Sequence, residues 1–291
     1  MIVGVCADKG SPGVTTLATA LAIAWPGRRL LLEADPSGGD LAFRARAAAS
    51  GELLADRPGL LTLAADARGA IPAEVLPHYA QATTWGVPVV VGPPGAQSYT
   101  PVRALWPAVA QVAAAWPGTV IADLGRLQPG NPAVSLARSA TAVLVLAEVS
   151  VEGLYHLRER VNELAHALGD PTRSHNPVAV VVAARRKDAG SAVRQVTHLL
   201  QAGGSPIPVA GVAAVDPVAA QQLREGQLSK RAAAGDLLTS ARELAATVCA
   251  WWPHLAVPAD QPEAVAPGPG APDGGAGDAA LAMARFPQGT R

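Results

Sequence analysis

The sequence contains few cysteines and no excess of charge of either sign. Its two cysteines, Cys6 and Cys249, lie far apart among 291 residues, which argues against a disulfide framework and a cysteine-rich zinc site. Lysine plus arginine and aspartate plus glutamate both total 23, so the formal net charge is zero. A chain without net positive charge has no bulk attraction to nucleic acid or anionic lipid. The net charge leaves open whether basic residues gather on one part of the surface.

Long hydrophobic runs are also missing. No uninterrupted apolar run reaches about 18 residues, so we expect no membrane-spanning helix. The first ten residues, MIVGVCADKG, contain neither a basic segment nor a long apolar segment, so we expect no signal peptide. Hydrophobic residues make up 49% of the chain, which is enough for a sizeable core. We therefore expect a cytoplasmic protein, with peripheral association at the inner face of the membrane left open.

Short apolar runs alternate with helical segments along most of the chain. The runs are continuous, which is typical of strands buried on both faces of a parallel sheet. We expect strands at 2–7, 29–34, 87–91, 119–122, 142–147, 177–183 and 209–212. We expect helices at 16–24, 101–116, 151–168, 189–202 and 240–252. The alternation predicts a doubly wound α/β fold, with a mostly parallel sheet and helices on both faces.

The composition changes near residue 256, where segments such as APGPGAPDGGAGD begin. Such a segment buries too little apolar surface to offset the entropy lost on ordering. We therefore expect one domain over residues 1–255 and a disordered tail over residues 256–291.

A glycine-containing loop, DKGSPGVTT at residues 8–16, separates the first expected strand from the first expected helix. Glycines at this position allow backbone N–H groups at the start of a helix to bind an anion, as in a P-loop. Gly10 and Gly13 permit the tight turn, and Thr15 is placed to offer its hydroxyl to Mg²⁺. A plain Gly/Pro turn is the alternative explanation.

This loop resembles the deviant P-loop of the MinD/ParA family of ATPases, which has the form KGGxGKT[TS]. Lys9 falls on the family's signature lysine, which usually reaches the partner's nucleotide across a dimer. The other matching residues are Gly10, Gly13, Thr15 and Thr16. Ser11 replaces the second glycine. The resemblance implies that the nucleotide is bound by Lys9, Gly10, Ser11, Pro12, Gly13, Val14, Thr15 and Thr16.

Val14 stands where the family has its P-loop lysine. That lysine is a point charge on the phosphates, and a charge-assisted hydrogen bond contributes roughly 1.5–3 kcal/mol. Its loss should weaken nucleotide binding by about one to two powers of ten. The backbone cradle would remain, so the loop still predicts a nucleotide site.

Two acidic motifs follow later strands. In LLLEADPSGGD, Glu33 replaces the first acid of the family's Asp-x-Asp-Pro-like segment, and Asp35 matches the second, which helps position the attacking water. TVIAD ends in Asp123, which resembles the Walker B carboxylate, so Thr15 and Asp123 are the expected Mg²⁺ ligands and 124–131 the expected switch II. Each acid could also simply end a strand.

Loss of the P-loop lysine with Lys9 retained resembles the atypical TadZ/CpaE branch, which positions pilus-type secretion machinery. The family's adenine-contacting Asn is absent, and Ala184, Arg185 and Arg186 occupy that region. The resemblance implies a homodimeric switch for spatial positioning or partitioning, with ATP and Mg²⁺ as ligands, Lys9 and Asp35 as catalytic residues, and an unidentified protein partner.

Two other functions stay open. The replacements in the loop also fit a pseudo-ATPase, a scaffold that no longer binds ATP productively, so ATP hydrolysis itself stays open. A nucleic-acid surface would have to be built from scattered basic residues. These are Arg185, Arg186, Arg224, Lys230 and Arg231.

Overall fold

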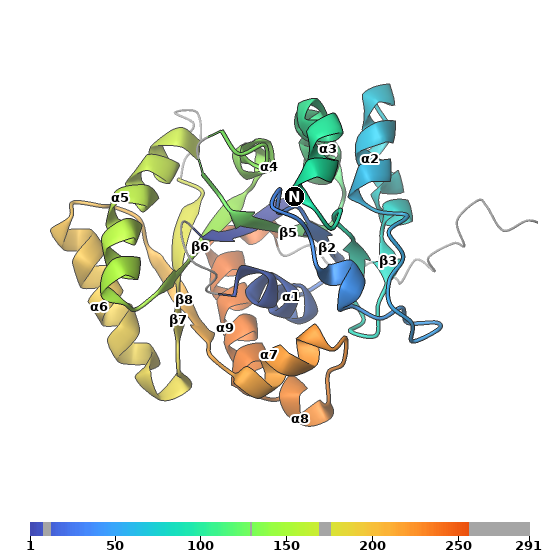
Figure 1. Ribbon diagram of the computed structural model, residues 1–291. Helices are drawn as coiled ribbons and strands as arrows, with labels where there is room; N and C mark the ends of the chain where they lie inside the picture. Colours follow the sequence, from blue (N-terminus) through green and yellow to red (C-terminus); the bar gives the residue numbers. More distant parts are fainter. Residues whose placement is uncertain (8–12, 129, 169–175, 256–291) are drawn as a thin grey trace, which may run out of the picture.

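A computed structural model describes residues 1–7, 13–128, 130–168 and 176–255. Within these ranges one sheet has eight strands, in the order β3-β4-β2-β5-β1-β6-β7-β8 (Figure 1). The strands are β1 Ile2–Ala7, β2 Arg29–Glu33, β3 Gln81–Ala82, β4 Pro88–Val90, β5 Thr119–Arg126, β6 Ala142–Glu148, β7 Val178–Ala184 and β8 Val209–Ala214. All neighbouring strands run parallel except β3, which is antiparallel to β4. The predicted mostly parallel sheet is confirmed.

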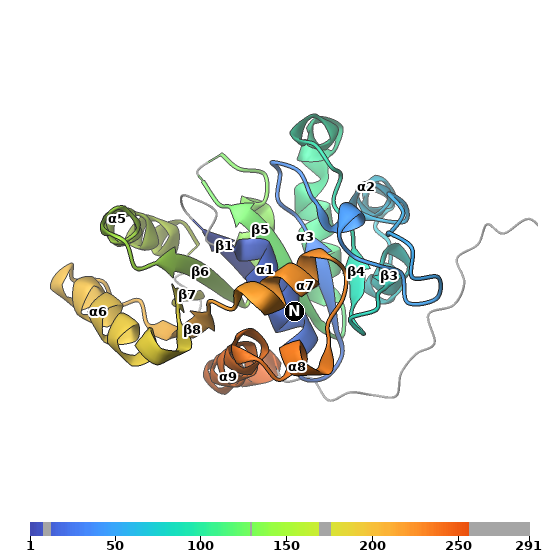
Figure 2. The same ribbon diagram turned by 60° about the horizontal axis from the view of Figure 1, so that its bottom comes forward.

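Helices cover both faces of this sheet, as predicted (Figures 1 and 2). The helices in the described ranges are α1 Val14–Ala24, α2 Leu60–Asp66, α3 Trp106–Ala115, α4 Val134–Ser139, α5 Val151–Leu168, α6 Ala189–Ala202, α7 Pro217–Arg224, α8 Lys230–Ala233 and α9 Asp236–Trp251. Residues of α1, α7, α8 and α9 share one hydrophobic core, and residues of α2 to α6 share the other. Alternate residues of the strands feed the two cores, because successive side chains point to opposite faces.

Several boundaries differ from those expected. The helix expected at 101–116 is divided into a 3₁₀ segment, Ala96–Leu105, and α3. Pro101 lies inside the 3₁₀ segment, and proline lacks the N–H that a regular helix needs. β5 extends to Arg126, beyond the predicted end at residue 122 and into the segment expected to be switch II. The short elements β3, α2, α4, α7 and α8 were not predicted, because their hydrophobic periodicity is too brief to recognise.

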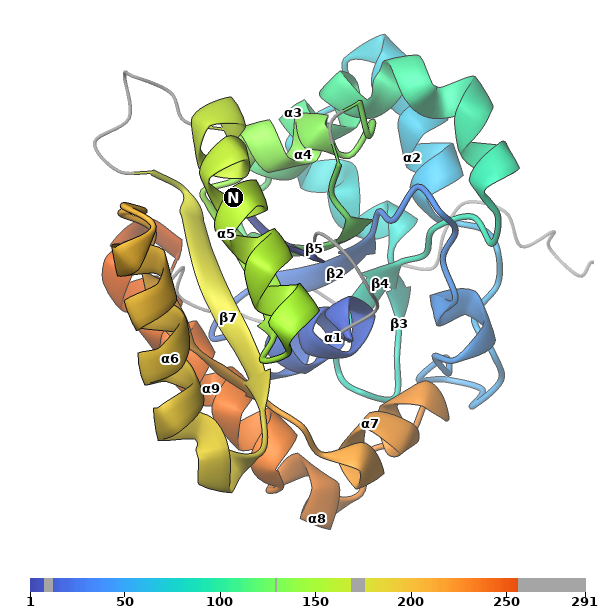
Figure 3. The same ribbon diagram turned by 60° about the vertical axis from the view of Figure 1, so that its left-hand side comes forward.

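The topology places the start of α1 at the carboxyl end of β1 and beside the carboxyl ends of the neighbouring strands. β1 lies between β5 and β6, and β5 in turn pairs with β2. Side chains that follow these parallel strands therefore gather at one edge of the sheet, where open α/β sheets bind ligands. Figure 3 shows α1 beside this edge, and α7 on the side of α1 that faces away from the sheet.

Two further expectations concern the C-terminal tail and membrane-spanning helices. The expected disordered tail, residues 256–291, lies outside the described residues. No helix in the described part of the chain combines the length and apolar character needed to cross a membrane.

Candidate functional site

The loop between β1 and α1 is described from Gly13 onward. Gly13 precedes α1 with a φ of 97°, a left-handed conformation that favours glycine, and its carbonyl accepts the first helical bond from Leu17 N at 2.9 Å. The N–H groups of a helix's first turn have no partners within the helix and can bind an anion. Lys9, Gly10, Ser11 and Pro12, all predicted to bind nucleotide, lie outside the described residues.

Thr15 and Asp123 come together at this edge, as the predicted magnesium pair requires. The Thr15 hydroxyl donates a hydrogen bond to the Asp123 carboxylate, which also accepts from Gly125 N at 3.1 Å. Asp123 is 1% exposed, and burial raises its pKa to about 6 even though both hydrogen bonds oppose the shift. A hydroxyl and a buried carboxylate are oxygen ligands of the kind that Mg²⁺ prefers.

Asp35 lies directly against the end of β5. Gly125 has a φ of 57°, and a Cβ built there would lie 2.0 Å from Asp35 Cγ, so this close approach requires glycine. Asp35 Oδ1 accepts a hydrogen bond from Ser37 N at 2.8 Å, which holds the carboxylate in the turn after β2. Its negative charge also contributes to the raised pKa of Asp123, so the two acids share one site.

Glu33 has a role in the interior that the sequence did not reveal. Its Oε1 accepts hydrogen bonds from Asp40 N and Leu41 N at 2.8 and 2.9 Å, and its Oε2 accepts from Gly92 N at 2.9 Å. Burial raises its pKa to about 7, against the effect of these backbone N–H groups. Glu33 therefore ties two loops to the end of β2.

A cavity of about 350 Å³ unites most of the predicted residues. Its walls include Gly13, Val14, Thr15, Thr16, Asp35 and Asp123. Val14 is itself 8% exposed and packs into the core on the α1 side of the sheet. We call this space the polar cavity, because carboxylates, hydroxyls and arginine side chains surround it.

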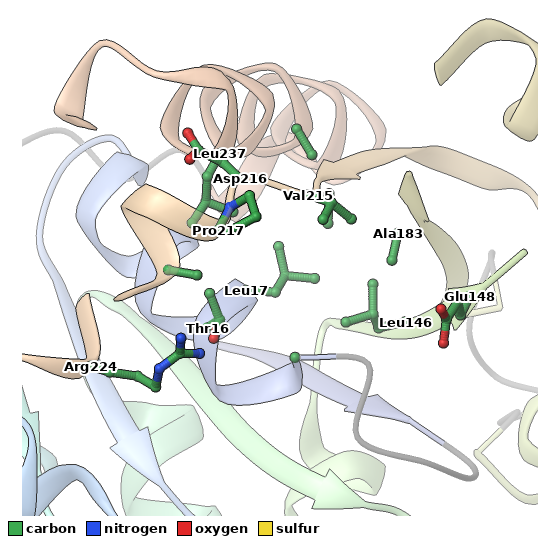
Figure 4. Close-up of a pocket in the computed structure, with 14 residues that line it drawn as sticks. Thr16, Leu17, Leu146, Glu148, Ala183, Val215, Asp216, Pro217, Arg224 and Leu237 are labelled. Atoms are coloured by element: carbon green, nitrogen blue, oxygen red, sulfur yellow. The ribbon is translucent and has the colours of Figure 1, made fainter. Parts of the chain in front are cut away.

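A second cavity, of about 340 Å³, adjoins the first (Figure 4). We call it the apolar cavity, since its walls include Leu17, Leu146, Ala183, Val215 and Pro217. Gly13, Thr16 and Arg224 line both cavities, so the two spaces meet at the start of α1. A polar compartment joined to an apolar slot suits a ligand with a charged end and a flat, less polar end.

The sequence missed two cations of the polar cavity. Arg44 follows a short 3₁₀ turn, Leu41–Phe43, and Arg224 ends α7. Arg44 lies just beyond the LLLEADPSGGD segment and Arg224 lies near no recognised motif, and folding brings both to the cavity at the start of α1. Arg224 was predicted only as a member of a basic surface, and Arg186 of that set instead forms an ion pair with Glu243.

No protein-family model and no curated protein matches this chain. Solved structures do. A ParA family ATPase from Chlorobium tepidum TLS has a TM-score of 0.65 at 14% identity, covering 84% of this chain and 97% of that one. A chain of the MinC:MinD cell division protein complex of Aquifex aeolicus has a TM-score of 0.60 at 13% identity, covering 86% of this chain and 95% of that one.

A third solved structure was determined with a nucleotide. The septum site-determining protein MinD from Pyrococcus horikoshii OT3, complexed with Mg-ADP, has a TM-score of 0.53 at 15% identity, covering 84% of this chain and 93% of that one. Each comparison spans nearly the whole of the known structure. The chain therefore has the fold of the MinD and ParA ATPases.

Proposed function

We propose that the chain is a nucleotide-dependent switch of the MinD/ParA type, which binds Mg-ATP and serves the spatial positioning or partitioning of a cellular cargo. The observation that carries this proposal is the Thr15–Asp123 hydrogen bond at the start of α1, inside a cavity that continues into an apolar slot. The shared fold supports it, because one of the similar proteins is a ParA family ATPase and another was solved with Mg-ADP.

The proposed roles follow the two cavities. The phosphates would lie in the polar cavity, on residues 9–16, and the base would lie in the apolar cavity. Thr15 and Asp123 would hold Mg²⁺, which usually takes one or two protein ligands and completes its shell with phosphate and water. Asp35, held beside Gly125, would orient the attacking water, and Lys9 would contact the partner's nucleotide across a homodimer.

Weak or absent hydrolysis is part of the proposal. Val14 is buried and uncharged, so it cannot place a positive charge on the phosphates where charge develops during phosphoryl transfer. A switch of this kind works by binding and dimerising. The replacement of the P-loop lysine also fits a TadZ/CpaE-like role in positioning secretion machinery, with a protein partner as in the MinC:MinD complex.

Dimerisation provides the test of this proposal. We expect millimolar Mg-ATP to convert the purified chain from monomer to dimer, measured by size-exclusion chromatography with light scattering. Lys9→Ala should bind a fluorescent ATP analogue yet stay monomeric, because Lys9 would act only across the interface. A chain that stays monomeric at saturating Mg-ATP would contradict the switch.

The buried Val14 also favours a second candidate, a pseudo-ATPase scaffold that has lost nucleotide binding. Calorimetry separates the two functions, since a scaffold gives no heat with ATP up to millimolar concentration. In a scaffold, a Val14→Lys change should have no effect on ATP binding. In a nucleotide-binding switch, the same change should strengthen ATP binding by about 10- to 100-fold.

A further inference from the structure

Among the described residues, four carboxylate side chains line the polar cavity, and the position of the usual P-loop lysine provides no charge. The carboxylates are those of Glu33, Asp35, Asp40 and Asp123, and position 14 contributes a valine side chain. The N–H groups at the start of α1 carry partial charges, which together equal about half an elementary charge. A nucleotide triphosphate carries several negative charges, so a further cation near this loop would be needed to balance them.

Arg224 is the side chain best placed to supply this charge. It lines both the polar and the apolar cavity, and in Figure 4 its guanidinium points toward Thr16 in the first turn of α1. Its Nε and Nη2 donate hydrogen bonds to Gln221 Oε1 at 3.2 and 2.7 Å. Gln221 is neutral, so these bonds orient the guanidinium without cancelling its charge.

The other arginines of the polar cavity are less well placed. Arg44 forms an ion pair with Asp40, four residues before it, which compensates its charge. Arg126 lines the polar cavity but not the apolar one, so it does not lie where the two cavities meet. Position and charge together favour Arg224.

The end of α7 is fixed by contacts with a distant part of the chain. The carbonyl of Glu225 accepts from Arg46 Nε at 3.1 Å, and the carbonyl of Gly226 accepts from Thr84 Oγ1 at 2.8 Å. Gly226 has a φ of 69°, and a Cβ built there would lie 2.4 Å from the carbonyl oxygen of Arg44. The backbone that carries Arg224 is therefore held against Arg44 and Arg46, in the segment after β2.

The start of α7 is fixed as well. Asp216 Oδ1 accepts a hydrogen bond from Ala219 N at 3.0 Å, and Pro217 occupies the first turn. Such a cap and a first-turn proline both favour a helix beginning at this point. With both ends held, α7 presents Arg224 to the start of α1 in a preorganised way, and little ordering entropy would be lost on binding a ligand.

We propose that Arg224 replaces the missing P-loop lysine, supplying from the end of α7 the positive charge that holds the phosphate chain of a bound nucleotide. This inference rests on the proposed nucleotide-binding function. An arginine suits the role, because its planar guanidinium donates two parallel hydrogen bonds to phosphate oxygens.

The test compares Arg224→Ala with Arg194→Ala, which removes the same charge from an exposed position on α6. Binding of a ribose-labelled fluorescent ATP with Mg²⁺ is measured first, followed by displacement with unlabelled ATP and with adenosine. We expect Arg224→Ala to weaken ATP binding by about 10- to 100-fold and to leave adenosine binding unchanged, since one charge-assisted contact is lost. Arg194→Ala should match the wild type for both ligands.

Two results would overturn the inference while leaving the proposed function intact. One is an Arg224→Ala protein that binds ATP as tightly as the wild type. The other is an equal loss of ATP and adenosine affinity, which would indicate a distorted pocket rather than a missing phosphate contact. A wild-type chain that binds neither ligand would instead refute the proposed function, and this inference with it.

Discussion

At the scale of single residues, the carboxyl group of Glu33 gives the protein a pH-dependent stability. Burial raises its pKa to about 7 in the folded protein, whereas an unfolded glutamate has its ordinary value of 4.5. The folded state therefore holds the proton more tightly between these two values. Stability from this group is fully present below pH 4.5, and it is lost as the pH rises through 7.

Substitution by glutamine tests this behaviour. Glu33→Gln cannot ionise, so we expect the wild type to lose stability relative to the variant when the pH is raised from 5 to 7.5. Urea unfolding of both proteins at the two pH values measures the difference. A difference that does not change with pH would show that Glu33 ionises in the folded protein as easily as in water. The variant's new amide, which faces Gly92 N–H, costs the same at both pH values.

The carboxyl group of Glu33 also shows what the sequence could not reveal. Asp35 and Asp123 were predicted as site residues, because each follows an apolar strand within a motif that resembles those of the MinD/ParA family. Glu33 was expected only as a replaced acid. Its three backbone partners come from loops as far away as Gly92, and no pattern of residue types encodes such contacts.

At the scale of secondary structure, the ends of α6 and α7 provide a matched pair of glycines. Gly226 and Gly204 share a φ of 69°, so replacing either by alanine costs similar backbone strain, about 1–3 kcal/mol. A Cβ at Gly226 meets the carbonyl of Arg44, whereas a Cβ at Gly204 meets nothing within 4 Å. The pair therefore separates backbone strain from the contact between α7 and the segment after β2.

We expect Gly226→Ala to unfold at a lower temperature than Gly204→Ala and to bind labelled ATP more weakly, because α7 must move away from Arg44. Thermal unfolding and fluorescence titration measure the two effects. Gly204→Ala should lose stability from strain alone and keep the wild-type affinity. Equal affinities for the two variants would indicate that the position of α7 is irrelevant to the site.

The strands other than β3 and most of the long helices were predictable from sequence, whereas α7 was not. The apolar runs of β1, β6 and β7 are continuous and β-branched, which identifies strands of a parallel sheet covered on both faces. α7 has only eight residues, PVAAQQLR, so its apolar periodicity is too short to recognise in the sequence. Its importance comes from where the fold places it, beside the start of α1.

At the scale of the whole molecule, nucleotide binding should stabilise the folded chain. A ligand at 100 times its dissociation constant adds about 2.7 kcal/mol to the free energy of unfolding. For a domain of this size that corresponds to a rise of about 5–10 °C in the unfolding temperature. We expect this rise with Mg-ATP in differential scanning fluorimetry, and a smaller one with ATP and a chelator.

Asp123→Asn should remove the difference between ATP with and without Mg²⁺, because the buried carboxylate would no longer hold the metal. Asp188→Asn, at an exposed position before α6, should keep the difference and serves as the control. An Asp123→Asn protein that still responds to Mg²⁺ as the wild type does would place the metal elsewhere.

The distance along the chain between α1 and Arg224 has a consequence for synthesis on the ribosome. A P-loop that carries its own lysine is chemically complete as soon as its first helix has been made. Here the phosphate-binding charge arrives only when residue 224 has been translated and α7 has docked on the segment after β2. Tight nucleotide binding would then report that translation has passed this point, and shorter nascent chains would bind ATP more weakly.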